Sequence, residues 1–181
     1  MKKNLVKFSV YVVVSITFIM TVILHFFKSL DLLKCLSFIA TSSEILVIIY
    51  FKFLWKIKKL NFFKIVNLNG KWDCELEYDY PEGVKHKKNT TIVIRQDLFG
   101  IQVNMDSNET NSYSIIADIE KDRDREYLVY AYKTETKFDY REHNRDQLGG
   151  VKLLINDNQN MEGEYWTNNK TLGSMKLKKR V

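Results

Sequence analysis

Two long apolar runs open the chain and predict two transmembrane helices. The first extends from Leu5 to Phe27 and is interrupted mainly by Lys7 and His25. Crossing a hydrocarbon core takes about 20 residues of helix, which this run supplies. The second run extends from Leu32 to Trp55. Because a cleaved signal peptide has a shorter apolar core that ends at a small-residue cleavage site, the pattern favours two retained spans.

A polar turn lies near the middle of the second run. Glu44 follows Thr41, Ser42 and Ser43 directly. A carboxylate inside a bilayer is energetically costly and normally has a partner. Either the carboxyl group stays protonated or hydrogen-bonded within the helical hairpin, or it forms a contact between copies of the chain or lines a pore. We therefore take Glu44, Ser42 and Ser43 as candidate residues for transmembrane oligomerisation.

The basic residues are concentrated in the first third of the chain. Residues 1–67 contain ten Lys or Arg and two Asp or Glu, whereas residues 68–181 contain eighteen and twenty. Lysines precede the first apolar run and follow the second, so the positive-inside rule places both termini in the cytoplasm. The second part of the chain has no basic surplus, and a nucleic-acid polymer is therefore not an expected partner.

Strict alternation of apolar and polar residues begins near Leu68 and predicts an all-β domain. The predicted strands are residues 72–80, 89–96, 101–105, 112–119, 126–132, 150–156, 161–167 and 172–179. Consecutive hairpins favour a closed, antiparallel up-and-down barrel of about eight strands, which has no exposed edges. A charged stretch from Thr134 to Gln147 interrupts the pattern. We accordingly divide the chain into a two-helix transmembrane hairpin with basic flanks, residues 1–67, and a cytosolic β-barrel domain, residues 68–181.

The last predicted hairpin has glycines on its inward-facing side. Gly163 and Gly173 share that side with Tyr165 and Thr167. Glycine weakens a strand and often marks a place where the backbone bends sharply or a ligand approaches closely. Barrel curvature and space for a ligand both account for these two glycines.

No catalytic constellation is present in the sequence. The three histidines are scattered and have no partners at metal-ligand spacing, so no metal site is expected. The run of mixed charges from Asp118 to Glu126 is typical of a solvated hairpin tip. No glycine-rich phosphate loop occurs, and two cysteines do not make a disulfide framework. We expect a protein that is not an enzyme and has no cofactor.

Aromatic and polar residues on the predicted strands form the candidate ligand site. Aromatic rings fill the cores of small barrels, but they also stack on nucleobases with little sequence preference. Hydroxyl, amide and guanidinium groups beside them are able to bind phosphate. From strand alternation and side-chain chemistry, the candidate ligand-binding residues are Trp72, Tyr78, Arg95, Gln96, Tyr130, Tyr132, Tyr165 and Thr167.

The order of several motifs resembles a known protein family. Two adjoining apolar spans lead into "LNGKWDCELEY" and then "IVIRQ", and the chain closes with "MEGEYWTNNKTLGSMKL". This arrangement is similar to that of the two-transmembrane β-barrel effectors of bacterial CBASS anti-phage immunity, over nearly the full chain.

The resemblance implies a function and a set of partners. A nucleotidyltransferase encoded nearby would make a cyclic nucleotide, most simply a cyclic dinucleotide, as the activating ligand of the barrel. Binding would drive homo-oligomerisation of the membrane segments, disruption of the bacterial inner membrane and abortive infection. Two alternatives remain open: a membrane-tethered barrel that binds lipid or another small ligand, and a structural tether that binds no nucleotide.

Overall fold

The computed structural model describes residues 11–12, 14–19, 21–22, 32–61, 64–79, 85–140 and 146–180. The chain forms two compact units. One comprises Met1–Ile65 with Asp97–Phe99, and the other comprises Val66–Gln96 with Gly100–Val181.

The first unit contains one long helix and two short 3-10 turns. They are α2 (Leu32–Lys52), η1 (Leu54–Lys56) and η2 (Lys58–Leu60). Trp55 is fully buried, and Tyr50 Oη donates a hydrogen bond of 2.9 Å to Leu60 O, which holds the second turn against the end of α2. Leu98 N donates to Phe51 O at 3.0 Å, so the 97–99 segment belongs to this unit.

The prediction of two transmembrane helices is wrong. Within the described residues, no helix is long and apolar enough to cross a membrane. Most of the first predicted span, Leu5 to Phe27, lies outside the described residues. In the second, α2 contains Lys34 and Glu44, and the hydroxyl residues before Glu44 interrupt its apolar sequence. The predicted location, as a two-span protein of the inner membrane with both termini cytoplasmic, depended on these helices and is wrong for the same reason.

The polar turn of α2 places its side chains in different surroundings. Glu44 is exposed, Ser42 is half-buried, and Ser43 is completely buried. Because the two predicted spans are wrong, the transmembrane location that we predicted for these residues is wrong as well. A role in contacts between copies of the chain stays a prediction.

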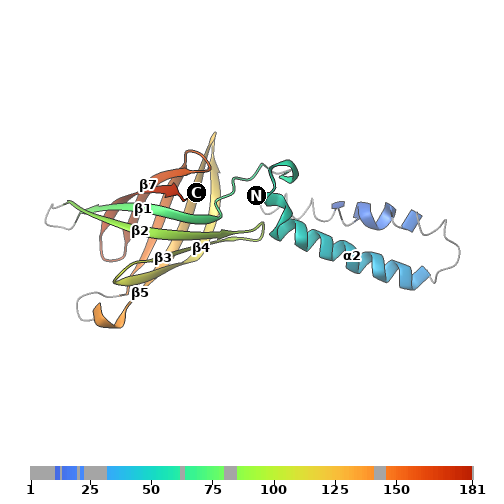
Figure 1. The fold of residues 1–181 in the computed structure, drawn as a ribbon, viewed down its shortest axis with the longest axis horizontal. Helices are drawn as coiled ribbons and strands as arrows, with labels where there is room; N and C mark the ends of the chain where they lie inside the picture. The colour runs from blue at the N-terminus through green and yellow to red at the C-terminus, as the bar shows by residue number, and fades with distance from the viewer. Residues whose placement is uncertain are drawn as a thin grey trace. The chain divides into compact units, whose positions relative to one another are not determined.

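The second unit is a closed barrel of eight antiparallel strands in chain order. The strands are β1 (Gly70–Asp79), β2 (Lys85–Gln96), β3 (Ile101–Asp106), β4 (Thr110–Asp122), β5 (Arg125–Thr136), β6 (Leu148–Ile155), β7 (Asn160–Thr167) and β8 (Leu172–Lys179). Each strand pairs with the next, and β8 pairs with β1 to close the sheet (Figure 1). The barrel part of the predicted fold is thereby confirmed.

Side-chain alternation in the strands builds the core. In β1, Trp72, Cys74 and Leu76 are buried, whereas Asp73 and Glu75 between them are exposed. The same period of two holds in β5, where Leu128, Tyr130 and Tyr132 face inward and complete a core shared by all eight strands. Burial raises the pKa of the Cys74 thiol to about 12, so this cysteine is an inert core residue.

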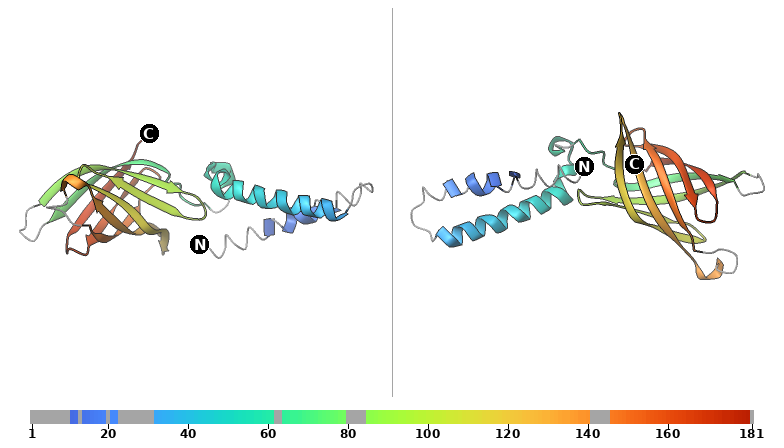
Figure 2. Two further views of the ribbon diagram at one scale, coloured as in Figure 1. Left: turned by 90° about the horizontal axis from the view of Figure 1, so that it is seen from below. Right: turned by 180° about the vertical axis from the view of Figure 1, so that it is seen from behind.

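The charged run predicted as a hairpin tip is one, and both charged segments include strand residues. The run Asp118–Glu126 contains the end of β4 and the start of β5, joined by a tight turn in which Arg123 has φ 53°. The stretch Thr134–Gln147 begins with the last residues of β5. A 3-10 turn, η3 (Phe138–Tyr140), follows them. Figure 2 shows β4 and β5 as a long hairpin that extends along the barrel wall.

Candidate ligand-binding cavity

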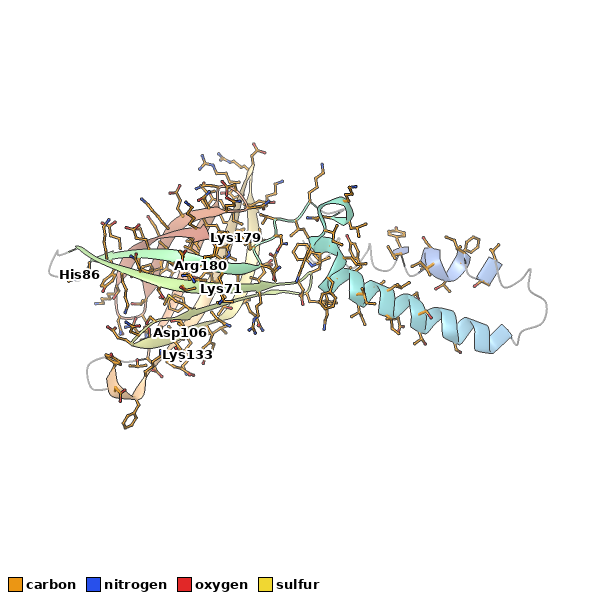
Figure 3. All side chains as sticks on the ribbon, viewed as in Figure 1. Lys71, His86, Asp106, Lys133, Lys179 and Arg180 are labelled. Carbon is orange, nitrogen blue, oxygen red and sulfur yellow. The ribbon has the colours of Figure 1, made fainter. Side chains whose placement is uncertain are left out.

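The barrel is hollow toward one end. The cavity lies at the end where β1 joins β2, β3 joins β4, β5 joins β6 and β7 joins β8, and its volume is about 160 Å³. It is lined by Leu76, Tyr78, Lys88, Val103, Met105, Ser107, Glu109, Thr110, Ser112, Tyr113, Tyr130, Tyr132, Thr134, Gln147, Val151, Tyr165, Thr167, Thr171 and Met175. In Figure 3, His86 lies at this end of the barrel, and Lys179 and Arg180 lie toward the other end.

The opposite end of the barrel is sealed by a hydrogen-bonded plug. Gln96 Oε1 accepts from Leu68 N at 2.7 Å, and Gln96 Nε2 donates to Val66 O at 3.0 Å. Trp72 Nε1 donates to Leu68 O at 2.9 Å. These hydrogen bonds hold residues 66–68, which lead into β1, across this end of the barrel. The interior is accessible from the cavity end.

Three of the predicted site residues lie outside the cavity. Trp72 and Gln96 face inward as the alternation predicted, but they are part of the sealed floor. Arg95 lies between two inward-facing residues of β2, so its side chain is exposed on the outer surface. Strand alternation determines which face a residue occupies but not its height along the barrel axis, which is why Trp72 and Gln96 were included. Arg95 was included for its guanidinium group, although the alternation already put it on the outer face.

Five of the predicted site residues are brought together in the cavity wall. They are Tyr78, Tyr130, Tyr132, Tyr165 and Thr167, contributed by β1, β5 and β7. Tyr130 and Tyr132 are 7% and 8% exposed, and their ring centroids are 6.2 Å apart. Tyr78 stacks on His86 with the ring centroids 5.6 Å apart. Whether any of them binds the ligand stays a prediction.

Burial raises the pKa of two cavity tyrosines, Tyr130 and Tyr132. It raises the pKa of Tyr132 to about 12 and raises the pKa of Tyr130 as well, because an ionised phenolate would lose its hydration there. Both hydroxyl groups therefore stay neutral well above the pH at which an exposed tyrosine ionises, and a neutral phenol is a hydrogen-bond donor.

Glycines let two of these rings lie against the barrel wall. A Cβ atom at Gly173 would come within 2.4 Å of the Tyr165 ring and 2.6 Å of Glu77 O. A Cβ at Gly149 would come within 2.5 Å of the Tyr132 ring. A Cβ at Gly163 would come within 2.0 Å of Lys152 O, so this glycine allows the close contact between β7 and β6. Gly173 and Gly149 thus accommodate protein side chains.

Sequence reasoning missed the charged and hydroxyl part of the lining. Lys88 occupies the inward row of β2 that includes Ile92 and Ile94, so alternation alone could have identified it. Ser112 occupies the inward row of β4 in the same way, paired with Met105 and Thr134. Glu109 lies in the short connection between β3 and β4, where no periodic signal exists.

The lining suits non-covalent recognition of a polar ligand. Aliphatic residues alternate with tyrosine and hydroxyl side chains, and Lys88 and Glu109 supply one charge of each sign. Within the described ranges, no three His, Cys, Asp or Glu side chains are grouped to hold a metal ion. Such a concave, largely preformed site with a few polar groups is typical of small-molecule binding.

The chain is similar in sequence to two curated proteins. CD-NTase-associated protein 15 of Staphylococcus schleiferi is 32% identical over 146 residues, which cover 80% of this chain and 78% of the relative. CD-NTase-associated protein 15 of Escherichia albertii is 27% identical over 198 residues, which cover 97% and 95%. Among solved structures, the redesigned β-barrel mFAP1 bound to DFHBI matches with a TM-score of 0.45 and 8% identity, covering 62% of this chain and 94% of that chain.

A family model matches the barrel itself. Residues 63–179 match the model described as Cap15, cyclic dinucleotide receptor domain, and this range contains all eight strands. The match and the two relatives confirm the resemblance to CBASS effectors that the motif order indicated. The chain belongs to the Cap15 cyclic dinucleotide receptor family of CBASS effectors.

Proposed function

We propose that the open cavity of the barrel is the binding site for a cyclic dinucleotide made by a partner nucleotidyltransferase. The chain acts as the receptor for this messenger and performs no chemistry on it. The observation that carries the proposal is the cavity itself: it is open at one end, sealed at the other, and lined by tyrosines, hydroxyl groups and one lysine.

The chemistry of the lining matches the parts of a cyclic dinucleotide. Nucleobases stack on aromatic rings, and Tyr130, Tyr132 and Tyr165 offer such rings. Phosphodiester oxygens accept hydrogen bonds from hydroxyl and ammonium donors, which Thr167 and Lys88 provide. A ligand with two phosphates needs few such donors, which fits a barrel without a basic surplus.

An apolar ligand is the second candidate function. Val103, Met105, Val151 and Met175 form an aliphatic part of the lining that is able to contact a hydrocarbon chain. Ser112 Oγ, which has no hydrogen-bond partner among the described residues, would then stay buried without a polar partner, which costs free energy. A solid-core tether is the less favoured alternative because the barrel interior is not filled.

We further propose that the ligand-bound state self-associates and that the assembly disrupts a lipid bilayer. A ligand drives assembly only when it binds the assembly-competent state more tightly than the other. Glu44, which is exposed, and Ser42, which is half-buried, are the candidate contacts between copies, whereas Ser43 is completely buried within its own chain. Light scattering and leakage of dye-loaded vesicles, each measured with and without ligand, test the two steps separately. An unchanged particle mass on saturation with ligand contradicts the assembly step.

Calorimetry of the full chain against a panel of cyclic di- and trinucleotides, with a fatty acid as comparison, tests the binding proposal. Loss of one stacking ring costs about 1–3 kcal/mol, so Tyr165→Ala should weaken binding roughly ten- to a hundredfold. Arg95→Ala is the matched control, since Arg95 is exposed outside the cavity, and should bind as the unaltered chain does. Tight fatty-acid binding without heat from any cyclic nucleotide would overturn the proposal.

A further inference from the structure

One hydroxyl group in the cavity is buried and has no partner. Ser112 is 6% exposed, and its Oγ makes no hydrogen bond to any residue that the structure describes. It lines the cavity on the inward row of β4. A buried polar group without a hydrogen bond is costly and rare in native proteins, so each one needs an explanation.

Neighbouring hydroxyl groups show that Ser112 is an exception. Ser114 Oγ, two residues further along β4, accepts from Val103 N at 2.9 Å. Thr134 Oγ1, on the strand that faces Ser112, accepts from Gln147 N at 2.7 Å. The hydroxyl groups of Thr110 and Ser107 lie 3.1 Å apart at the cavity rim. The barrel satisfies these four groups by itself and leaves Ser112 available to a bound molecule.

The charged lining residues form a single ion pair. Lys88 Nζ lies 3.3 Å from Glu109 Oε2, with 30% and 43% of the two side chains exposed. Among the lining residues that the structure describes, they are the one cation and the one anion. Partly exposed ion pairs contribute little to stability, so a phosphate group that enters the cavity is able to replace the carboxylate.

We propose that Lys88 and Ser112 form the phosphodiester-binding side of the cavity, and that Glu109 is a built-in competitor that occupies Lys88 until ligand arrives. Lys88 pairs with a phosphate oxygen near the mouth, and Ser112 Oγ donates to a ligand oxygen deeper in the cavity. Glu109 thereby raises the ligand concentration that activates the receptor. This inference rests on the proposed function of the cavity as a cyclic dinucleotide site.

Binding of the full chain to a panel of cyclic dinucleotides, measured by calorimetry, tests the ion-pair exchange. Lys88→Met should weaken binding at least tenfold and reduce its dependence on salt, because a charge pair is lost. Glu109→Gln should tighten binding two- to tenfold, because the lysine no longer has a competing carboxylate. In the Lys88→Met background, Glu109→Gln should have less than half of that effect on the logarithm of Kd, as expected for coupled residues.

Ser112 needs a readout that separates binding from folding. Ser112→Ala should weaken binding at least threefold while Tm stays the same or rises, because the hydroxyl stabilises nothing in the free barrel. Ser114→Ala is the matched control: it removes the acceptor for Val103 N, so Tm should fall. A drop in Tm for Ser112→Ala similar to that for Ser114→Ala, with unchanged binding, contradicts the role of Ser112.

The outcomes distinguish this inference from the function on which it rests. If no cyclic dinucleotide binds to the unaltered chain, the proposed function fails. If a cyclic dinucleotide binds and Tyr165→Ala weakens it, but Glu109→Gln leaves Kd unchanged or raises it, the competitor role of Glu109 is refuted and the cavity assignment stands.

Discussion

Substitution of Gly173 by alanine tests whether glycine is what lets the Tyr165 ring lie flat against the barrel wall. The added Cβ would lie 2.4 Å from Tyr165 Cε1 and 2.6 Å from Glu77 O. The ring is able to rotate, but the Glu77 carbonyl belongs to the β1 backbone opposite β8 and cannot move without disturbing the sheet. The substitution therefore creates one clash that rotation of the Tyr165 ring relieves and one clash with the Glu77 backbone that stays.

The expected cost follows from these two contacts. Overpacking a well-packed interior costs about 1–3 kcal/mol, and contact with backbone places Gly173→Ala in the upper part of that range, about 2–3 kcal/mol. For a barrel of this size, that corresponds to a fall in Tm of roughly 10 °C. The displaced ring would also enter the cavity, so binding of the ligand should weaken.

Thermal and urea denaturation of the full chain measure the cost. Gly100→Ala is the matched control, because a Cβ there would meet nothing within 4 Å, and it should change stability by less than about 0.5 kcal/mol. In a Tyr165→Ala background the ring clash disappears, so Gly173→Ala should cost about half as much. Equal stabilities of Gly173→Ala and Gly100→Ala would refute the reasoning.

Two further predictions concern the barrel. The pKa of Tyr132 is raised from 10.0 to about 12, so the unfolded chain releases this proton first, and the free energy of unfolding should fall by about 2 kcal/mol between pH 10 and 12. Urea denaturation should show a smaller fall for Tyr132→Phe, and an identical fall would contradict the assignment. Gln96→Ala leaves Leu68 N and Val66 O without their partners and should cost about 2–4 kcal/mol in the same assay. The exposed neighbour Arg95 should tolerate alanine within about 0.5 kcal/mol, and equal losses at both positions would be inconsistent with the plug.

The strands were predictable because apolar and polar residues alternate along a half-buried strand, and this alternation is visible in the sequence. The last predicted strand, residues 172–179, coincides with β8, and the first differs from β1 by only a few residues. The boundaries of β4 and β5 were less predictable. Their hairpin extends outward with charged residues on both faces, so the alternation disappears while the backbone pairing continues.

The helical part shows the limit of hydropathy as a signal. The apolar composition of residues 5–27 and 32–55 predicted two spans, but the described helices do not include one suited to cross a membrane. A judgement from apolar composition gave too little weight to Lys34, Glu44 and the hydroxyl residues that interrupt the apolar sequence of α2.

The sequence by itself determined the class of the domain, the number and order of its strands, the inward faces of β1, β2, β3, β5, β7 and β8, and the family to which the chain belongs. All of these depend on local periodicity or on motif order. Only the tertiary structure decided which inward-facing residues meet. Trp72 and Gln96 share a face with Tyr78 and Lys88, yet they seal one end of the barrel while Tyr78 and Lys88 line the cavity at the other. Height along the barrel axis depends on the stagger between paired strands, and that stagger is set by contacts between residues distant in the sequence.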